Sequence, residues 1–162
     1  MEYPQSKTSK LTASALVAAI FITVMYFTQG ISFGPIQIRF ATALYALPFL
    51  FPFLVVPLSL ANSFSNFLLG GLGVLDVAGG LAAGLITSGA VSLVGRWNLP
   101  MPLVIPIVIL GPALIVPIWL SHIFGLPYPI LVLQLGLGQT PPAVLGYILT
   151  RGLSNIIKEN HS

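Results

Sequence analysis

Long apolar runs, separated by short stretches that are polar or rich in glycine and proline, extend over most of the chain. A helix needs about 20 apolar residues to cross a bilayer, so each run of roughly that size predicts a transmembrane helix. The pattern predicts an all-α polytopic membrane protein, a six-transmembrane-helix bundle that forms a single domain over residues 1–162. The predicted spans are residues 11–28, 38–51, 53–69, 75–94, 101–121 and 128–149.

The breaks between these runs refine the prediction. The second run is too short to cross a bilayer without tilting, and a loop over residues 29–37 with Gly34 and Pro35 precedes it. The first run is too long for the hydrophobic region of a signal peptide, so we expect it to remain in the protein as a span. Proline residues inside the fifth and sixth spans are tolerated where neighbouring helices or a cavity satisfy the freed carbonyl groups.

Small and polar residues lie at helical spacing in two of the spans. Ala15 and Ala19 are one turn apart in the first span, and small residues at this spacing let a second helix approach closely. That helix belongs either to this chain or to a partner. Asn62 and Asn66 share one face of the third span, where they either join helices or contact a ligand.

Composition excludes several classes of protein. Hydrophobic residues make up 56% of the chain and charged residues 6%, whereas a soluble domain carries about 25% charged residues. The net charge of +3 comes from dispersed residues and makes no nucleic-acid footprint. Cysteine is absent, which excludes disulfides and thiolate metal sites. We find no catalytic constellation and no phosphate-binding loop, so no enzyme activity, metal or cofactor is expected.

Basic residues are distributed unevenly over the predicted topology. Six spans place both termini and the loop between the fourth and fifth spans on one side of the membrane. The positive-inside rule assigns that side to the cytoplasm, because it holds all but one of the basic residues. These residues are Lys7, Lys10, Arg96, Arg151 and Lys158.

Arg39 is the one basic residue on the opposite side, and Asp76 is the only acid away from the termini. A guanidinium keeps its charge in a protein, and a charge at the centre of a bilayer costs about 2.5–3.5 kcal/mol on insertion scales. Arg39 therefore requires a membrane surface, a cavity or a partner. The two charges either form a salt bridge that joins two helices or contact a ligand.

Several other polar and aromatic side chains fall in the same outer half of the predicted bundle. An apolar pocket with a few placed polar groups is typical of a small-molecule site. Trp119 and Tyr128 also suit interfacial anchors, which is the commoner role of these residue types. The candidate ligand contacts from the pattern alone are Arg39, Asp76, Asn66, Trp119, His122, Tyr128 and Gln134.

Three segments resemble one known family, the queuosine-precursor transporter (QueT) family, whose members are substrate-binding S-components of energy-coupling factor (ECF) transporters. The resemblance is good over the first four spans and weak over the last two. It is carried by FGPIQIRFATALYALP at residues 33–48, by Asn66 with Gly70-Gly71, and by Gly73-Val-Leu-Asp76.

The resemblance implies a six-helix bundle in the plasma membrane of a prokaryote that captures a vitamin or nucleobase precursor from outside. It implies docking, through Ala15 and Ala19, on a transmembrane T-component that is driven by two cytoplasmic ATPases. It also implies ligand contacts from the first loop and the outer part of the last span. These contacts are Gln37, Arg39, Asn66, Asp76, Gln134 and Gln139.

The chain departs from the family pattern at two positions. Members commonly carry a glutamate where Thr42 stands, and often an acid where Gln139 stands. A cationic amine requires a desolvated carboxylate, and Asp76 is the only one left. We therefore expect a neutral heterocycle, such as a nitrile deazaguanine or the hydroxymethyl pyrimidine precursor of thiamine, rather than an aminomethyl deazaguanine.

Two other functions fit the same composition. One is a structural or assembly subunit of a membrane complex that binds no ligand and uses its small residues only for packing. The other is a small channel or secondary transporter, although such transporters usually show inverted repeats and ionisable residues at mid-depth. We see neither feature in this chain.

Overall fold

The computed structural model describes residues 6–33, 37–70 and 72–159, and within these ranges every regular element is a helix. The predicted all-α class is therefore confirmed. Gly34 and Pro35 of the predicted loop lie outside the described residues.

The elements, with η marking 3₁₀ and π turns, are α1 (Lys7–Phe27), α2 (Gln29–Ser32), η1 (Phe40–Phe49), η2 (Pro52–Leu54), α3 (Val55–Ser65), η3 (Asn66–Gly70), α4 (Val74–Arg96), η4 (Met101–Leu103), α5 (Val104–Ile115), α6 (Pro117–Phe124) and α7 (Tyr128–Glu159).

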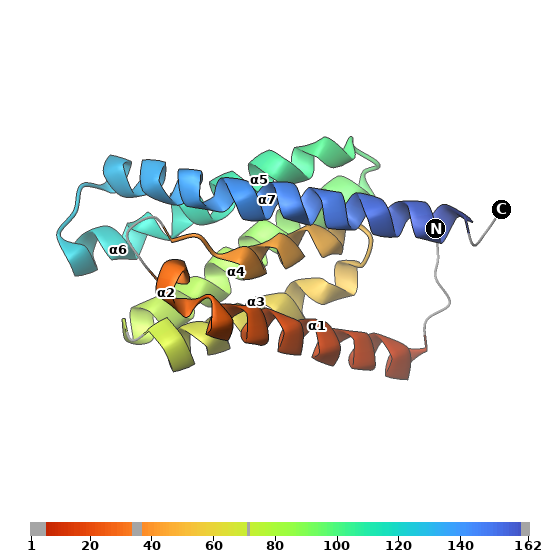
Figure 1. Cartoon of the computed structure of the whole chain (residues 1–162), viewed down its shortest axis with the longest axis horizontal. Coiled ribbons are helices and arrows are strands. Elements are labelled where there is room, and N and C mark those ends of the chain that lie inside the picture. Colours follow the sequence, from red (N-terminus) through yellow and green to blue (C-terminus); the bar gives the residue numbers. More distant parts are fainter. Residues whose placement is uncertain (1–5, 34–36, 71, 160–162) are drawn as a thin grey trace.

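The main helices lie along the long axis of the molecule and alternate in direction (Figure 1). The start of α1 and the ends of α4 and α7 lie at the same end of this axis, which is also the end nearest both termini (Figure 1). The starts of η1 and α4 lie toward the opposite end (Figure 1). The fold thus gathers the cationic ends of three helices at one pole, and we call the other pole the distal end.

Four helical stretches in the described residues are long and apolar enough to cross a membrane: Lys7–Phe27, Pro52–Gly70, Val74–Arg96 and Met101–Phe124. The predicted count of six spanning helices is therefore not confirmed. The predicted span 38–51 is a ten-residue 3₁₀-helix, η1. At about 2.0 Å per residue, such a helix is shorter than the roughly 30 Å of a bilayer core.

Other boundaries also differ from the prediction. The segment predicted as a loop over residues 29–37 contains the short helix α2. The span 101–121 is broken where α5 gives way to α6, which starts with Pro117, a residue that suits the first position of a helix. The span 128–149 is part of α7, which runs on to Glu159 and is not among the four apolar stretches. Gln134 and Gln139 lower its hydropathy.

The core is built around η1, whose apolar side chains are buried between the longer helices. Two glycines of neighbouring helices let its backbone come close. A Cβ atom on Gly95 of α4 would collide with the carbonyl oxygen of Phe49, and one on Gly146 of α7 with that of Ala43. The tight 3₁₀ turn and these glycines place η1 in the middle of the bundle, where it can present polar side chains to a buried site.

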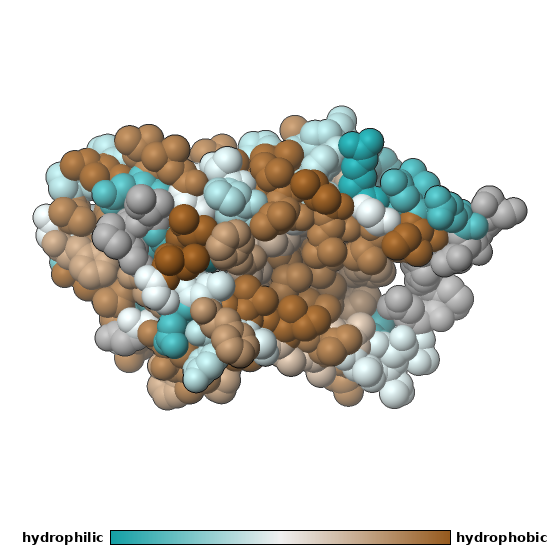
Figure 2. All heavy atoms as spheres, in the orientation of Figure 1, coloured by the Kyte–Doolittle hydropathy of each residue, from teal (hydrophilic) through white to brown (hydrophobic). Residues whose placement is uncertain are grey.

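The outer surface is mostly apolar. Brown, apolar residues cover much of the visible face, and teal, polar residues gather at the end where α7 finishes (Figure 2). A soluble monomer rarely exposes apolar patches of more than a few hundred Å², so this surface requires lipid or protein around it. Together with the four apolar helices, it makes this a membrane protein.

Candidate functional site

Arg39 is the residue that precedes η1, and its side chain is only 4% exposed. Its Nε donates a hydrogen bond to the carbonyl oxygen of Ser32 at 3.2 Å. Its Nη1 donates to Oδ1 of Asn66 at 3.2 Å and to Oδ1 of Asn62 at 3.5 Å. The guanidinium also lies over the ring of Phe33, 4.9 Å from its centre, in a cation–π contact. The partners of the buried charge are therefore all neutral: a backbone carbonyl, two side-chain amides and an aromatic ring.

The two asparagines of α3 and η3 have a second role. The Nδ2 of Asn62 donates to the carbonyl oxygen of Gly80, and the Nδ2 of Asn66 donates to that of Asp76, both at 2.9 Å. Each side chain therefore joins α4 through its nitrogen and holds Arg39 through its oxygen. Of the two alternatives raised for this pair, the joining of helices is observed directly.

Asp76 lies in the first turn of α4, where the helix dipole favours a negative charge, and is 1% exposed. Its Oδ1 accepts a hydrogen bond from Nε1 of Trp119 in α6 at 3.1 Å. Gly79 makes this contact possible, because a Cβ atom there would lie 2.6 Å from the indole ring. Among the described residues, Asp76 and Arg39 form no direct ion pair, so the salt bridge considered from the sequence is not present.

Three buried polar atoms near the start of η1 and α4 lack a hydrogen-bond partner among the described residues: Nη2 of Arg39, Oδ2 of Asp76 and Oε1 of Gln37. A buried donor or acceptor left unpaired costs about 1–3 kcal/mol, and more when it is charged. Such groups are rare in native structures and call for a specific explanation. A cationic donor and an anionic acceptor that are both free and both buried can receive a polar ligand. We call Arg39, Asp76, Asn62, Asn66 and Gln37 the distal cluster.

A network of neutral polar groups adjoins the distal cluster. The hydroxyl oxygen of Thr42 lies 2.7 Å from the carbonyl oxygen of Arg39 and 2.6 Å from Oε1 of Gln139 on α7. A hydroxyl has one proton, so it donates to one of these oxygens at a time. The Nε2 of Gln139 donates to the carbonyl oxygen of Gln37 at 3.5 Å. Gln37 has a positive φ of 48°, which is uncommon for a residue other than glycine.

The remaining sequence candidates form hydrogen bonds outside the distal cluster or have an unpaired polar atom. His122 is exposed, and its Nδ1 is 3.0 Å from the carbonyl oxygen of Ile118 in its own helix. Tyr128 is 39% exposed, and its hydroxyl donates to the carbonyl oxygen of Leu114 at 2.8 Å. Gln134 is half-buried with its Oε1 unpaired. In the described part of the chain, no hydrogen bond joins these three residues to Arg39.

Sequence reasoning missed two aromatic residues that lie six positions before and six positions after Arg39 in the chain. Phe33 supports the guanidinium, but nothing in its spacing distinguishes it from other apolar residues. Tyr45 is 1% exposed and lies in an apolar run, where it looks like a core residue. Its position three residues after Thr42, on the same face of a 3₁₀-helix, could have identified it only if the helix type had been known.

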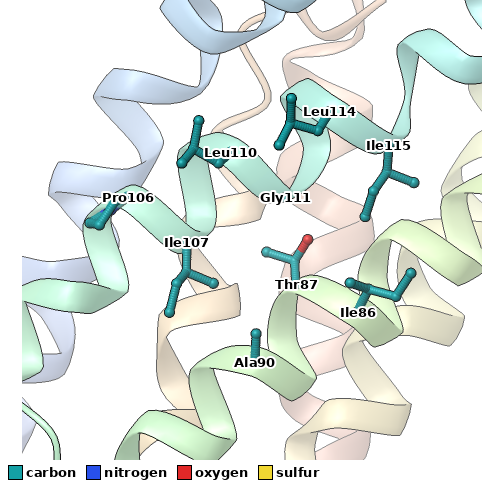
Figure 3. Close-up of a pocket in the computed structure, with 9 residues that line it drawn as sticks. All are labelled: Ile86, Thr87, Ala90, Pro106, Ile107, Leu110, Gly111, Leu114 and Ile115. Atoms are coloured by element: carbon teal, nitrogen blue, oxygen red, sulfur yellow. The ribbon is translucent and has the colours of Figure 1, made fainter.

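An open groove between α4 and α5, of about 380 Å³, is a different kind of site (Figure 3). Its walls are apolar apart from Thr87, whose side chain lies between Ile86 and Ala90 of α4 and faces α5 (Figure 3). It contains none of the candidate ligand contacts. The described residues also include no group of three His, Cys, Asp or Glu side chains that could hold a metal ion. The distal cluster is therefore the best candidate site.

Comparison with known proteins gives one match. The profile of a protein family described as QueT transporter matches residues 11–155. None of the curated proteins and none of the solved structures matches the chain.

Proposed function

Since the chain belongs to the QueT transporter family, we propose that it is the substrate-binding subunit, or S-component, of an importer of the ECF type. It is a membrane transport protein without enzymatic activity of its own. In this proposal it captures a queuosine precursor or a related neutral heterocycle at the distal cluster, and passes it inward when partner subunits hydrolyse ATP.

The observation that carries this proposal is the pair of free charged atoms, Nη2 of Arg39 and Oδ2 of Asp76. Both side chains are almost fully buried, so water screens neither of them. An interior of low dielectric strengthens a hydrogen bond to such groups and penalises leaving them unpaired. A ligand that forms hydrogen bonds with both atoms is therefore bound more tightly than it would be if these atoms already had partners within the protein.

The neutral neighbours of the cluster support a neutral ligand. Thr42, Gln37 and Gln139 bring hydroxyl and amide groups and no charge. The charges of Arg39 and Asp76 balance each other, so the site carries no excess negative charge to hold a cationic amine. A nitrile deazaguanine and the hydroxymethyl pyrimidine precursor of thiamine are both neutral heterocycles with several donors and acceptors, as this site requires.

We further propose that the partners are a transmembrane T-component and two cytoplasmic ATPases. Ala15 and Ala19 are exposed on α1, and Ala15 lines an apolar groove of about 630 Å³ between α1 and α3. A partner helix can approach closely over small residues. The basic ends of α1, α4 and α7 share one pole, which the positive-inside rule assigns to the cytoplasm of a prokaryotic cell.

Mass spectrometry of the purified protein tests the proposal. The detergent-solubilised chain is incubated with a mixture of the nitrile deazaguanine and the hydroxymethyl pyrimidine, washed, and analysed for retained small molecules. We expect one neutral heterocycle in roughly equimolar amount, because the buried free charges favour a bound partner. If the folded protein retains neither these compounds nor any small molecule from the cell, the ligand-free assembly subunit becomes the better account.

A further inference from the structure

Tyr45 places a polar atom in the middle of the apolar core. The side chain is 1% exposed, and its hydroxyl has no hydrogen-bond partner in the part of the chain that the structure describes. Its ring stacks on Phe21 of α1, with the centroids 5.7 Å apart and the planes at 28°. Phenylalanine would make the same ring contact without burying an unpaired hydroxyl, which costs about 1–3 kcal/mol. The stacking contact therefore does not account for the hydroxyl.

The position of Tyr45 connects it with Arg39. In a 3₁₀-helix residues three apart lie over one another. Thr42 and Tyr45 are three residues apart and share one face of η1, and the amide of Thr42 donates to the carbonyl oxygen of Arg39, the residue before η1, at 3.0 Å. Both side chains are buried, with exposed fractions of 1% for Tyr45 and 4% for Arg39, and Thr42 between them contacts the carbonyl oxygen of Arg39. The free hydroxyl of Tyr45 and the free Nη2 of Arg39 thus belong to the same buried environment.

The chemistry of the guanidinium limits the hydrogen bonds that the hydroxyl of Tyr45 can form. A guanidinium donates hydrogen bonds and accepts none. The hydroxyl of Tyr45 therefore cannot donate to Arg39, and its proton is available to another acceptor. In this arrangement both Tyr45 and Nη2 of Arg39 offer a proton, and Oδ2 of Asp76 offers a lone pair.

We infer that Tyr45 is a further ligand-binding residue, whose hydroxyl donates to an acceptor on the heterocycle beside the acceptor that Arg39 binds. This inference rests on the proposed function and deepens it. It assigns the ligand class as a neutral nitrogen heterocycle that carries two acceptors, such as a lactam carbonyl and a ring nitrogen or nitrile, together with an N–H group for Asp76.

The substitution Tyr45→Phe tests this assignment, because it removes one oxygen atom and keeps the ring that stacks on Phe21. Tyr147→Phe is the matched control, since it removes the same atom from a hydroxyl that pairs only with Arg151 at the exposed side of α7. Both variants and the parent are titrated with the nitrile deazaguanine, and their melting temperatures are measured without ligand.

We expect Tyr45→Phe to bind the nitrile deazaguanine about tenfold more weakly, the value of one hydrogen bond, while its melting temperature stays equal to that of the parent or rises. The control should bind as the parent does. Equal binding by Tyr45→Phe and the parent would overturn the inference and leave the proposed function standing. A lowered melting temperature would overturn it as well, because the hydroxyl would then be structural. If the parent itself does not bind, the proposed function fails, and the assignment of Tyr45 fails with it.

Discussion

Replacing Arg39 with alanine should give a folded protein that no longer retains its heterocycle. Removing the guanidinium takes away the free donor Nη2 and leaves the carboxylate of Asp76 buried without an opposite charge nearby. A hydrogen bond to a charged group contributes about 1.5–3 kcal/mol, and a charge left buried without a partner costs more than the about 1–3 kcal/mol of a neutral group. We therefore expect the dissociation constant to rise by roughly 100-fold or more, measured by titration of the purified protein.

The matched control for this experiment is Arg96→Ala. Arg96 is exposed at the end of α4, at the pole opposite the distal cluster, so its loss removes the same charge without touching the site. Circular dichroism of both variants checks that the helices form. Asn62 and Asn66 still hold α4 through their nitrogen atoms, which is why we expect Arg39→Ala to fold. Binding within a factor of about 3 of the parent would reduce Arg39 to a structural role.

Replacing Ala15 or Ala19 with tryptophan should abolish assembly with a T-component and leave ligand binding nearly unchanged. Both alanines are exposed on α1, the least buried of the four apolar stretches. An indole at either position holds a partner helix away from the contact distance that small residues allow. Co-purification with the T-component and uptake of labelled ligand into vesicles measure the loss, and titration of the isolated subunit measures binding.

The control for the tryptophan variants is Leu110→Trp on α5. Leu110 is 50% exposed and lines the groove between α4 and α5 (Figure 3), so it adds the same bulk to another apolar surface. We expect this variant to assemble and transport as the parent does. Normal assembly and uptake by Ala15→Trp and Ala19→Trp would show that this face of α1 is not the docking surface.

The sequence predicts the helical class well because apolar runs alone determine where a chain can cross a membrane. It does not predict the pitch of those helices. The run over residues 38–51 is apolar like the other predicted spans, though shorter, and nothing in its pattern indicates that it forms the 3₁₀-helix η1, which Gly95 and Gly146 approach closely. The end of α7 was missed for the opposite reason, since its last turns are polar and extend beyond the apolar stretch that the prediction followed.

The candidate site could be predicted in part. Charged residues are rare in this apolar chain, so Arg39 and Asp76 can be identified as candidates from the sequence alone. The partners of these two side chains cannot be identified from the sequence. The contacts of Arg39 with Ser32 and of Asp76 with Trp119 join segments that only the tertiary fold brings together. The sequence places His122 and Tyr128 in the same predicted half of the bundle, but it does not show that their polar atoms lie near the carbonyl oxygens of Ile118 and Leu114.

The most direct test is an experimental structure of the protein with the retained heterocycle bound. We expect the density of the ligand to lie against Arg39 and Asp76, with hydrogen bonds to the two atoms that are free in the protein alone, Nη2 and Oδ2. Density for the heterocycle in the groove between α4 and α5, or in the groove between α1 and α3, with Nη2 and Oδ2 still unpaired, would contradict the account.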